Sequence, residues 1–370
     1  MTDRIYIRPI GFVPGPQSEH GNAIRLGGGM VYASRFAVAL RRDGRIVERW
    51  LAAPDTIGEV LGQLPDEVAA DAEQQWANLT LAHPALELGE RTVRLDQPQV
   101  MGILNVTPDS FSDGGEFMDK PDVQREQAAR MLEAGAAIID VGGESTRPGA
   151  KAVWEGDEIE RVVPAIEMCA AMGAAISVDT RKAAVMEAAL GAGASLVNDV
   201  SGLTYDPRSA EVVAKAGCPV ILMHAPGKGE DLHEGGHYTN VVLDVFDELR
   251  SRRDAALEAG IEAGHILLDP GIGFGKSLAD NLLLLNALPL FHALGHPLLL
   301  GASRKRMIGA LSNEAGADQR LGGSVALAFK GMDAGVQLQR VHDVPETVQA
   351  RNVWRGLRDA ALTDFGDLPN

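Results

Sequence analysis

The residues best suited to chemistry stand at corresponding points of the sequence, directly after short apolar runs. They are carboxylates, amides, a serine, basic side chains and histidines: Asn105, Asp140, Asp179, Asn198, His224, Asp269, Ser303 with Lys305, and Arg340 with His342. Carboxylates and amides can pair with the polar edge of a ligand, and the basic side chains can hold an anion. Any one of these residues fits a helix N-cap or a turn equally well, but seven or eight in register indicate a common site.

The apolar runs themselves are typical of a barrel of parallel strands. From about residue 97 onward, eight aliphatic or β-branched runs alternate with amphipathic or Ala-rich stretches, each long enough for a crossover helix. Eight such units over roughly 260 residues match an α/β fold of the (β/α)8 TIM barrel type. A doubly wound open sheet is the alternative, because periodicity alone does not exclude it. In a barrel, the carboxyl ends of the strands meet at one mouth and build the active site.

Side-chain alternation along a strand adds a more detailed expectation. Residues two apart point to the same face of a strand. If the last two strands continue far enough, Ser303 and Lys305 share a face, and so do Arg340 and His342. Lys305 and Arg340 would then both point into the mouth.

The stretch HEGGH, from His233 to His237, matches the H-E-x-x-H zinc pattern in its letters. Zinc binding by this pattern needs both histidines on one face of a stable helix. Two central glycines and the preceding APGKGEDL favour a loop. We therefore interpret both residues as loop histidines at the surface.

The stretch GIGFGKS, from Gly271 to Ser277, follows a strand and is similar to a phosphate-binding loop. The full motif requires a glycine at position 270, where Pro270 stands. We expect the glycines to let the chain turn tightly after Asp269, with a flexible loop beside a ligand as the alternative.

The region before the barrel has a different pattern, which mixes alternating strand-like runs with a helical stretch. The stretch RFAVALRRDGRIVERWLA contains two alternating runs around Asp43 and Gly44, a strong signal for a two-residue hairpin turn. A helical pattern follows, for which Asp55 is the expected N-cap and Pro65 an interruption. We predict a small α+β extension of unknown role over residues 1–92, followed by the barrel over residues 93–362.

Charge and composition limit the partners of the protein. The 370 residues carry a formal net charge of -17, so nucleic acid and anionic membranes would be repelled, and an anionic substrate needs a local basic pocket. Only Cys169 and Cys218 are present, which excludes a disulfide framework and suits a reducing cytoplasm. No apolar stretch has the form of a secretion signal or a membrane span, so we expect a cytoplasmic protein.

Seven segments, taken in order, resemble dihydropteroate synthase. They fall between about residues 97 and 358: GILNVTPDSFSDGG, IIDVGGESTRPGA, ISVDT, VNDVSG, LLDPGIGFGK, GASRKRMIG and RVHDV. The family has a (β/α)8 barrel, acts in folate biosynthesis and is a sulfonamide target. Its members are transferases that join 6-hydroxymethyl-7,8-dihydropterin pyrophosphate to para-aminobenzoate. The products are 7,8-dihydropteroate and pyrophosphate, formed by an SN1-like substitution without a side-chain nucleophile.

The resemblance implies a pterin site at the mouth. Asp269 would accept hydrogen bonds from the aminopyrimidinone edge, and Asn198 would bind along the same edge. Met223 would pack on the pterin, and Lys305 would donate to its carbonyl and ring nitrogen. Arg340 would stack on the ring face while reaching the pyrophosphate.

The resemblance also implies the catalytic residues and a metal ion. Asp179 would bind the other side of the pterin and stabilise the positive charge that develops as pyrophosphate leaves, assisted by Lys305 and Arg340. Asn105, Arg340 and His342 would bind the pyrophosphate, and Mg2+ at Asn105 would neutralise the departing charge. The implied aminobenzoate site combines loop residues with the seventh strand end: Phe111, Thr146, Arg147, Pro148, Ser303 and Lys305.

Two departures and two alternative functions accompany the resemblance. After LMH the sequence usual in the family is replaced by APGKGEDLHEGGHYTN, so contacts of the loop at residues 225–240 cannot be carried over from the family. In addition, the first 90 or so residues exceed the family core. One alternative is a pterin-dependent methyltransferase domain, which is not expected to carry TPDSFSDGG and SRK together. The other is a non-catalytic pterin-binding protein, which an intact aminobenzoate pocket and both Gly-rich loops oppose. The resemblance also implies a homodimer.

Overall fold

Eight parallel strands form the barrel that the sequence predicts. The computed structural model describes residues 3–15, 17–18, 21–107, 120–147, 149–227 and 229–362. Its barrel strands are β9 (Gln99–Asn105), β10 (Ile138–Gly142), β11 (Ile176–Asp179), β12 (Leu196–Asp199), β13 (Val220–Met223), β14 (Ile266–Asp269), β15 (Leu299–Leu300) and β16 (Leu338–Val341). Pairing runs from β14 down to β9 and on through β16 to β15. A parallel bridge between Leu268 and Leu298 joins the two ends of this order, so the open-sheet alternative is wrong.

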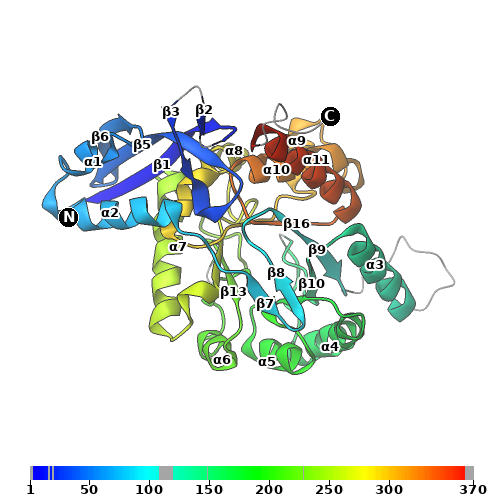
Figure 1. The fold of residues 1–370 in the computed structure, drawn as a ribbon. Helices are drawn as coiled ribbons and strands as arrows, with labels where there is room; N and C mark the ends of the chain where they lie inside the picture. Colours follow the sequence, from blue (N-terminus) through cyan, green and yellow to red (C-terminus); the bar gives the residue numbers. More distant parts are fainter. Residues whose placement is uncertain are drawn as a thin grey trace, which may run out of the picture.

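Helices surround the barrel, and each strand is connected to the next across the outside (Figure 1). They are α3 (Lys120–Ala134), α4 (Glu155–Ala171), α5 (Ala183–Gly191), α6 (Ser209–Ala216), α7 (Val241–Glu258), α8 (Leu278–Ala287), the 3-10 helix η4 (Leu288–Leu294), α9 (Arg306–Leu311), α10 (Leu321–Asp333) and α11 (Val344–Leu362). The strands read as continuous apolar runs because both of their faces are buried.

A short hairpin closes the amino end of the barrel. Strands β7 (Leu86–Leu88) and β8 (Arg91–Val93) pair antiparallel, and the hairpin crosses the middle of the barrel in Figure 1. Its apolar side chains pack on a layer of buried residues from the start of every strand: Met101, Ile138, Ala175, Leu196, Ile221, Leu267, Leu299 and Leu338. This end is therefore filled with apolar side chains, and any ligand site must lie at the carboxyl end.

The chain before the hairpin forms a small sheet with two helices. Strand β5 (Tyr32–Arg42) pairs antiparallel with β1 (Arg4–Val13), β4 (Ile24–Arg25) and β6 (Arg45–Ala52). The predicted hairpin turn is confirmed, because Asp43 and Gly44 both have positive φ, 50° and 78°. A separate short pair joins β2 (Gln17–Ser18) to β3 (Gly21–Asn22). The helices are α1 (Ile57–Leu61) and α2 (Asp66–Thr80).

The predicted N-cap of α1 is wrong by one residue. The cap is Thr56, whose hydroxyl makes no bond to the first turn of the helix. It accepts a hydrogen bond from the backbone N–H of Ala53 at 2.9 Å instead. The interruption expected at Pro65 is present, because α2 begins directly after it.

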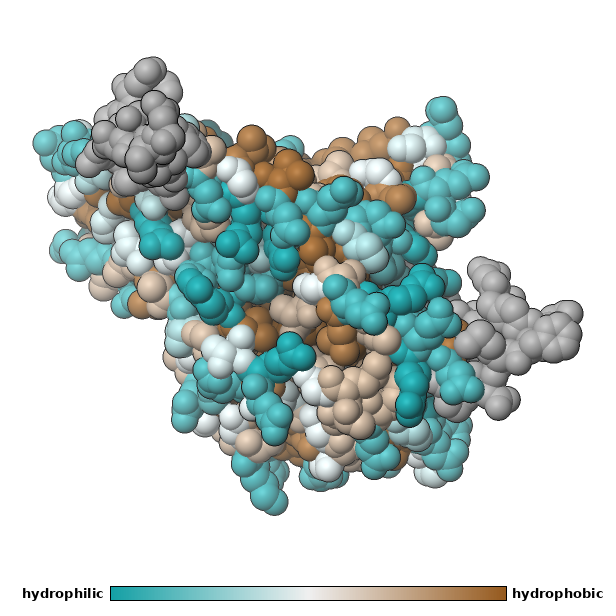
Figure 2. All heavy atoms as spheres, turned by 45° about the vertical axis from the view of Figure 1, so that its right-hand side comes forward, coloured by the Kyte–Doolittle hydropathy of each residue, from teal (hydrophilic) through white to brown (hydrophobic). Residues whose placement is uncertain are grey.

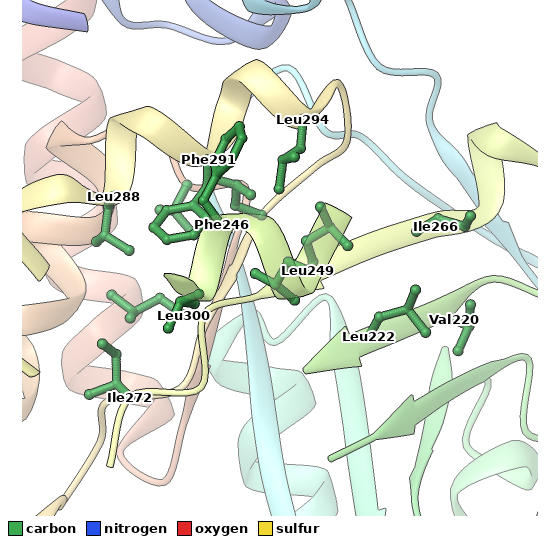
Figure 3. Packing of buried hydrophobic residues seen from close by; sticks show 14 of the residues in the cluster. Val220, Leu222, Phe246, Leu249, Ile266, Ile272, Leu288, Phe291, Leu294 and Leu300 are labelled. Carbon is green, nitrogen blue, oxygen red and sulfur yellow. The ribbon is translucent and has the colours of Figure 1, made fainter. Parts of the chain in front are cut away.

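The N-terminal sheet and α2 pack on one flank of the barrel, against α7 and η4 (Figure 1). Figure 3 shows Phe246 of α7 beside Phe291 of η4, and their ring centroids are 6.1 Å apart. Tyr6 meets Phe246 edge-on at 5.5 Å and donates its hydroxyl proton to Asp247 at 2.8 Å. These contacts make the extension and the barrel wall one continuous core.

Polar residues are prominent on one face of the molecule. In the face that Figure 2 shows, hydrophilic side chains cover most of the surface, and apolar atoms appear only in patches among them. Within the described residues, no helix is both long and apolar enough to cross a membrane.

Candidate active site

Arg340 joins two neighbouring carboxylates at the mouth of the barrel. Its Nε donates to Asp140 Oδ2 and its Nη2 donates to Asp179 Oδ2, both at 2.6 Å. Asn198 Nδ2 donates to the same Asp140 oxygen at 3.2 Å. Because β9, β10, β11, β12 and β16 are consecutive in the barrel, strand-end side chains far apart in sequence meet here. The sequence had placed Asp140 at a strand end without giving it a role, and the structure pairs it with Arg340.

Burial sets the charges of this cluster. It raises the pKa of Asp179 above its ordinary value, although Arg340 opposes the shift. Burial lowers the pKa of Arg340, but the carboxylates of Asp140 and Asp179 outweigh it, so this pKa is raised overall and the guanidinium stays charged. The mouth is therefore a basic pocket only in part, because two carboxylates neutralise its arginine.

Asp269 and Lys305 are two further charged groups of the mouth, and each favours the charged form of the other. Asp269 Oδ1 accepts the backbone N–H of Gly271 at 2.7 Å. A Cβ at Gly301 would lie 3.8 Å from Asp269 Oδ2 and 4.0 Å from Arg340 Cδ, so the missing side chain leaves the space between them open. Burial raises the pKa of Asp269 and lowers that of Lys305 to about 8. Lys305 Nζ lies 4.2 Å from the centre of the Phe274 ring.

The seventh strand is shorter than the alternation argument requires. β15 ends at Leu300, so Ser303 and Lys305 are not placed by a strand. A tight turn places them, with Arg304 between them at φ 56°, a left-handed conformation that is uncommon outside glycine. Ser303 Oγ lies 3.0 Å from His342 Nδ1 and accepts the backbone N–H of His342 at 3.2 Å.

His342 is neutral in this site. Burial, together with the positive charge of Arg340 nearby, lowers its pKa to about 3. Because an imidazole of this kind carries no charge near neutral pH, it can act on an anion only as a hydrogen-bond donor. The seventh and eighth strand ends thus supply one ammonium, one guanidinium and one neutral imidazole.

The side-chain oxygens of Asn105 and Asp179 face the same backbone glycine. A Cβ at Gly142 would lie 3.7 Å from Asn105 Oδ1 and 3.6 Å from Asp179 Oδ2. Oxygens of this kind suit Mg2+, which usually takes one or two protein ligands and completes its shell with water and phosphate. Within the described residues, no group of three or more His, Cys, Asp or Glu side chains could hold a metal by itself. The donor set therefore fits a magnesium ion bound together with a phosphate ligand.

An apolar cluster borders the polar groups. Met223 packs with Val200, Ala225, Leu232 and Phe274, and all five are almost fully buried. The cluster joins the strand end of β13, the loop after it and the glycine-rich loop after β14. Through Phe274 the cluster contacts Lys305, so apolar side chains and a cation lie side by side, a combination that suits an aromatic ring with polar edges.

The predicted aminobenzoate residues are described only in part. Phe111 and Pro148 lie outside the described residues. Thr146 is half-buried, and its carbonyl oxygen lies 3.0 Å from His233 Nε2. Arg147 is exposed, and its carbonyl accepts the backbone N–H of Ala150 at 3.0 Å.

The lysine of the glycine-rich loop has a structural position that the sequence did not reveal. Lys276 Nζ donates to the carbonyls of Gly271 and Phe274 at 2.9 and 3.0 Å, and lies 2.9 Å from His224 Nδ1. Gly271, Gly273 and Gly275 have positive φ, which confirms the tight turn after Asp269. The ammonium thus holds the loop closed on itself.

A buried ion cluster fixes the start of the loop after β10. Lys182 Nζ donates to Glu144, Glu158 and the carbonyl of Val153 at 2.9, 2.6 and 2.8 Å. Arg181 Nη2 lies 3.3 Å from Glu144. Arg181 and Lys182 come two and three residues after Asp179, in the stretch VDTRK. This position in the sequence could have indicated that they support the mouth.

The HEGGH stretch forms a loop, as the sequence predicts, but its two histidines differ. His237 is exposed, as expected. His233 is half-buried and contacts Thr146 and Gly275, so its interpretation as a surface histidine was wrong.

Comparison with known proteins gives the class of this fold and site. The family model described as "Pterin binding enzyme" matches residues 101–342. The dihydropteroate synthase of Bacillus subtilis is 44% identical over 283 residues, which are 76% of this chain and 93% of the relative. A probable bifunctional folylpolyglutamate synthase/dihydropteroate synthase of Haloferax volcanii is 50% identical over 264 residues, 71% of this chain and 31% of that longer relative.

Solved structures agree with this grouping. The Xanthomonas albilineans dihydropteroate synthase with 4-aminobenzoic acid has a TM-score of 0.70 at 45% identity, over 78% of this chain and 100% of that chain. The Yersinia pestis enzyme in a sulfonamide drug complex has a TM-score of 0.70 at 46% identity, over 74% and 99%.

The chain therefore belongs to the pterin-binding enzymes, and within them to the dihydropteroate synthases. It is a transferase of folate biosynthesis. Neither the methyltransferase reading nor the non-catalytic reading finds support in these comparisons.

Proposed function

We propose that the mouth residues of this chain condense 6-hydroxymethyl-7,8-dihydropterin pyrophosphate with para-aminobenzoate to give 7,8-dihydropteroate and pyrophosphate. The observation that carries the proposal is the arrangement of Asp140, Asp179 and Arg340 beside Asp269 and Lys305. It offers carboxylates and cations next to the buried apolar cluster of Met223 and Phe274. A flat ring with donor and acceptor edges, linked to an anionic leaving group, is the ligand that matches these features.

Asp269, Asn198 and Lys305 bind the pterin in this proposal. Asp269 Oδ1 is held by Gly271, while its Oδ2 borders the open space at Gly301, where it can accept from the aminopyrimidinone edge. Asn198 uses its amide along the same edge. Lys305 donates to the ring carbonyl, and Met223 packs on the ring.

Asp179 stabilises the charge that appears during the substitution. The carbon–oxygen bond to pyrophosphate breaks first, its electron pair leaves with the pyrophosphate, and positive charge develops on the pterin methylene. Because burial makes the ionised form of Asp179 costly, a positive charge beside this carboxylate is stabilised more than it would be in water. The amine of para-aminobenzoate then forms the carbon–nitrogen bond and loses one proton.

Arg340, His342 and Asn105 receive the pyrophosphate. Two of the nitrogens of Arg340 are bound to Asp140 and Asp179, so the guanidinium is oriented before the ligand arrives. Neutral His342 donates a hydrogen bond, and Asn105 supplies a side-chain oxygen for Mg2+. When bound, the ion would neutralise the charge of the leaving group.

The aminobenzoate pocket combines Ser303, Lys305 and Thr146 with Phe111, Arg147 and Pro148. Its support is the Phe274 ring, whose centre lies 4.2 Å from Lys305 Nζ. Sulfonamides, one of which is bound in the Yersinia pestis structure, would compete for the same pocket.

We also propose domain bounds, a dimeric state and a cytoplasmic location for the chain. We assign residues 1–92 to the extension and 93–362 to the catalytic barrel. A homodimer is supported by Val353 and Leu357, which expose apolar side chains on α11. The two buried free cysteines suit a cytoplasmic location.

Pyrophosphate release tests the proposed function. Purified protein would receive the pterin pyrophosphate and Mg2+, with and without para-aminobenzoate. We expect release coupled to dihydropteroate formation only when para-aminobenzoate is present. Pterin binding without any turnover would contradict the synthase assignment.

A further inference from the structure

His233 connects three segments of the mouth from within the loop that departs most from the family wording. Its ring stacks on Phe274, with centroids 5.1 Å apart and planes 8° from parallel. Its Nε2 lies 3.0 Å from the carbonyl oxygen of Thr146, and its Nδ1 accepts the backbone N–H of Gly275 at 3.4 Å. A carbonyl only accepts and a backbone N–H only donates, so these partners select the tautomer with hydrogen on Nε2.

The loop that carries His233 is itself held in place. Arg181, which is 5% exposed, donates through Nη1 to the carbonyls of Gly229 and Glu230 at 2.9 and 3.0 Å. Its guanidinium lies 4.2 Å from the centre of the Tyr205 ring. A Cβ at Gly236 would lie 1.8 Å from the carbonyl oxygen of Gly275, so this side of the loop packs directly on the glycine-rich loop. His233 is therefore presented from a backbone anchored on both sides of it.

The contacts of His233 lie on one side of the site. The centre of the Phe274 ring, on which His233 stacks, also lies 4.2 Å from Lys305 Nζ. Thr146 belongs to the loop after β10. Among the described residues, the hydrogen bonds and the stacking of the His233 ring go to these segments and not to Asp269 or Asn198, which the proposed function assigns to the pterin edge.

We infer that His233 is a positioning residue for para-aminobenzoate, the second substrate. It fixes the Phe274 ring under Lys305 and the Thr146 backbone at the edge of the pocket, and so sets the affinity for the aromatic acid without binding the pterin. This inference rests on the proposed function, because the pocket it positions is the proposed aminobenzoate pocket.

Steady-state kinetics of four variants test the inference. His233→Ala removes the ring and both hydrogen bonds, and we expect KM for para-aminobenzoate to rise about tenfold while KM for the pterin pyrophosphate stays within about twofold. His233→Phe keeps the stacking only, and His233→Gln keeps a donor for the Thr146 carbonyl only, so each should give an intermediate KM. His237→Ala, an exposed residue of the same loop, is the matched control and should behave as wild type.

The outcomes separate this inference from the proposed function. If wild type forms dihydropteroate and His233→Ala has an unchanged KM for para-aminobenzoate, the positioning role is wrong and the synthase assignment stands. An equal rise in both KM values, with a lower melting temperature, would show general loosening and also overturn it. Phe and Gln variants as impaired as Ala would have the same meaning. A wild type without turnover would overturn the proposed function and this inference with it.

Discussion

The two ends of the barrel are built from the same eight strands but carry opposite chemistry. At the amino end, a layer of one apolar residue for each strand meets the hairpin side chains Leu86, Leu88 and Val93, all nearly or fully buried. At the carboxyl end, the next few residues of the same strands are Asp140, Asp179 and their neighbours, which make ion pairs and hydrogen bonds.

This contrast shows how a short strand separates stability from function. A strand such as β11, Ile176–Asp179, buries its first residues and ends in a carboxylate only three positions later. Because the hydrophobic layer stabilises the fold without touching the mouth, changes at the two ends should have separable effects. The following predictions test that separation, beginning with the largest effect.

Removing a mouth residue should abolish turnover and leave the fold intact. We expect Asp179→Ala and Lys305→Ala to lower kcat/KM by about a thousandfold or more, because each removes a charge on which the reaction depends. Circular dichroism and the melting temperature should stay close to wild type. Near wild-type activity in either variant would show that the site assignment is wrong.

Truncating an apolar side chain of the hairpin at the amino end should lower the stability of the fold and leave turnover unchanged. Leu88 is fully buried in the hairpin, so Leu88→Ala should lower the free energy of unfolding by about 3 kcal/mol. Urea unfolding measures this loss. Activity per folded molecule should not change, since the residue lies at the far end of the barrel. Glu87→Ala, at the exposed position next to it, is the control and should change stability little. A loss of kcat in Leu88→Ala without unfolding would break the separation between the two ends.

The smallest expected effect is a pH dependence at the mouth. Burial lowers the pKa of Lys305 to about 8, so the ammonium that we propose as a donor to the pterin is present below this pH and is lost above it. The kcat/KM for the pterin pyrophosphate should therefore fall about tenfold for each pH unit above 8. In Lys305→Arg the guanidinium stays protonated, so the remaining activity should lose this decline. A decline that persists in the arginine variant would assign it to another group.

The sequence predicted the parts of this structure that depend on local periodicity. The eight strands, the Asp43–Gly44 turn and the strand-end positions of Asp179, Asn198 and Asp269 follow from apolar runs and turn signals. The sequence did not predict the contacts that depend on the direction of a side chain. Alternation would place Ser303 and Lys305 on a strand, whereas β15 ends early and a left-handed Arg304 places them.

Tertiary contacts explain what sequence reasoning missed. The stretch GIGFGKS is similar to a phosphate-binding loop only in part, and Lys276 turns to the carbonyls of its own loop because a buried amino group needs acceptors there. His233 was set aside with the false zinc pattern because its partners, Thr146 and Phe274, are remote in sequence. Periodicity in one dimension carries no information on such pairs.

The pairing of Asp140 with Arg340 also bears on the stage of synthesis and folding at which the mouth can be completed. The two residues are 200 positions apart, and β16 pairs with β9, the first strand of the barrel. During synthesis from the N-terminus, the carboxylates of β10 and β11 emerge long before the arginine that neutralises them. Closing so long a loop is entropically costly until most other contacts have formed. Until β16 has joined β9, Asp140 and Asp179 lack the guanidinium that bridges them, so the proposed pyrophosphate site depends on the last strand of the barrel.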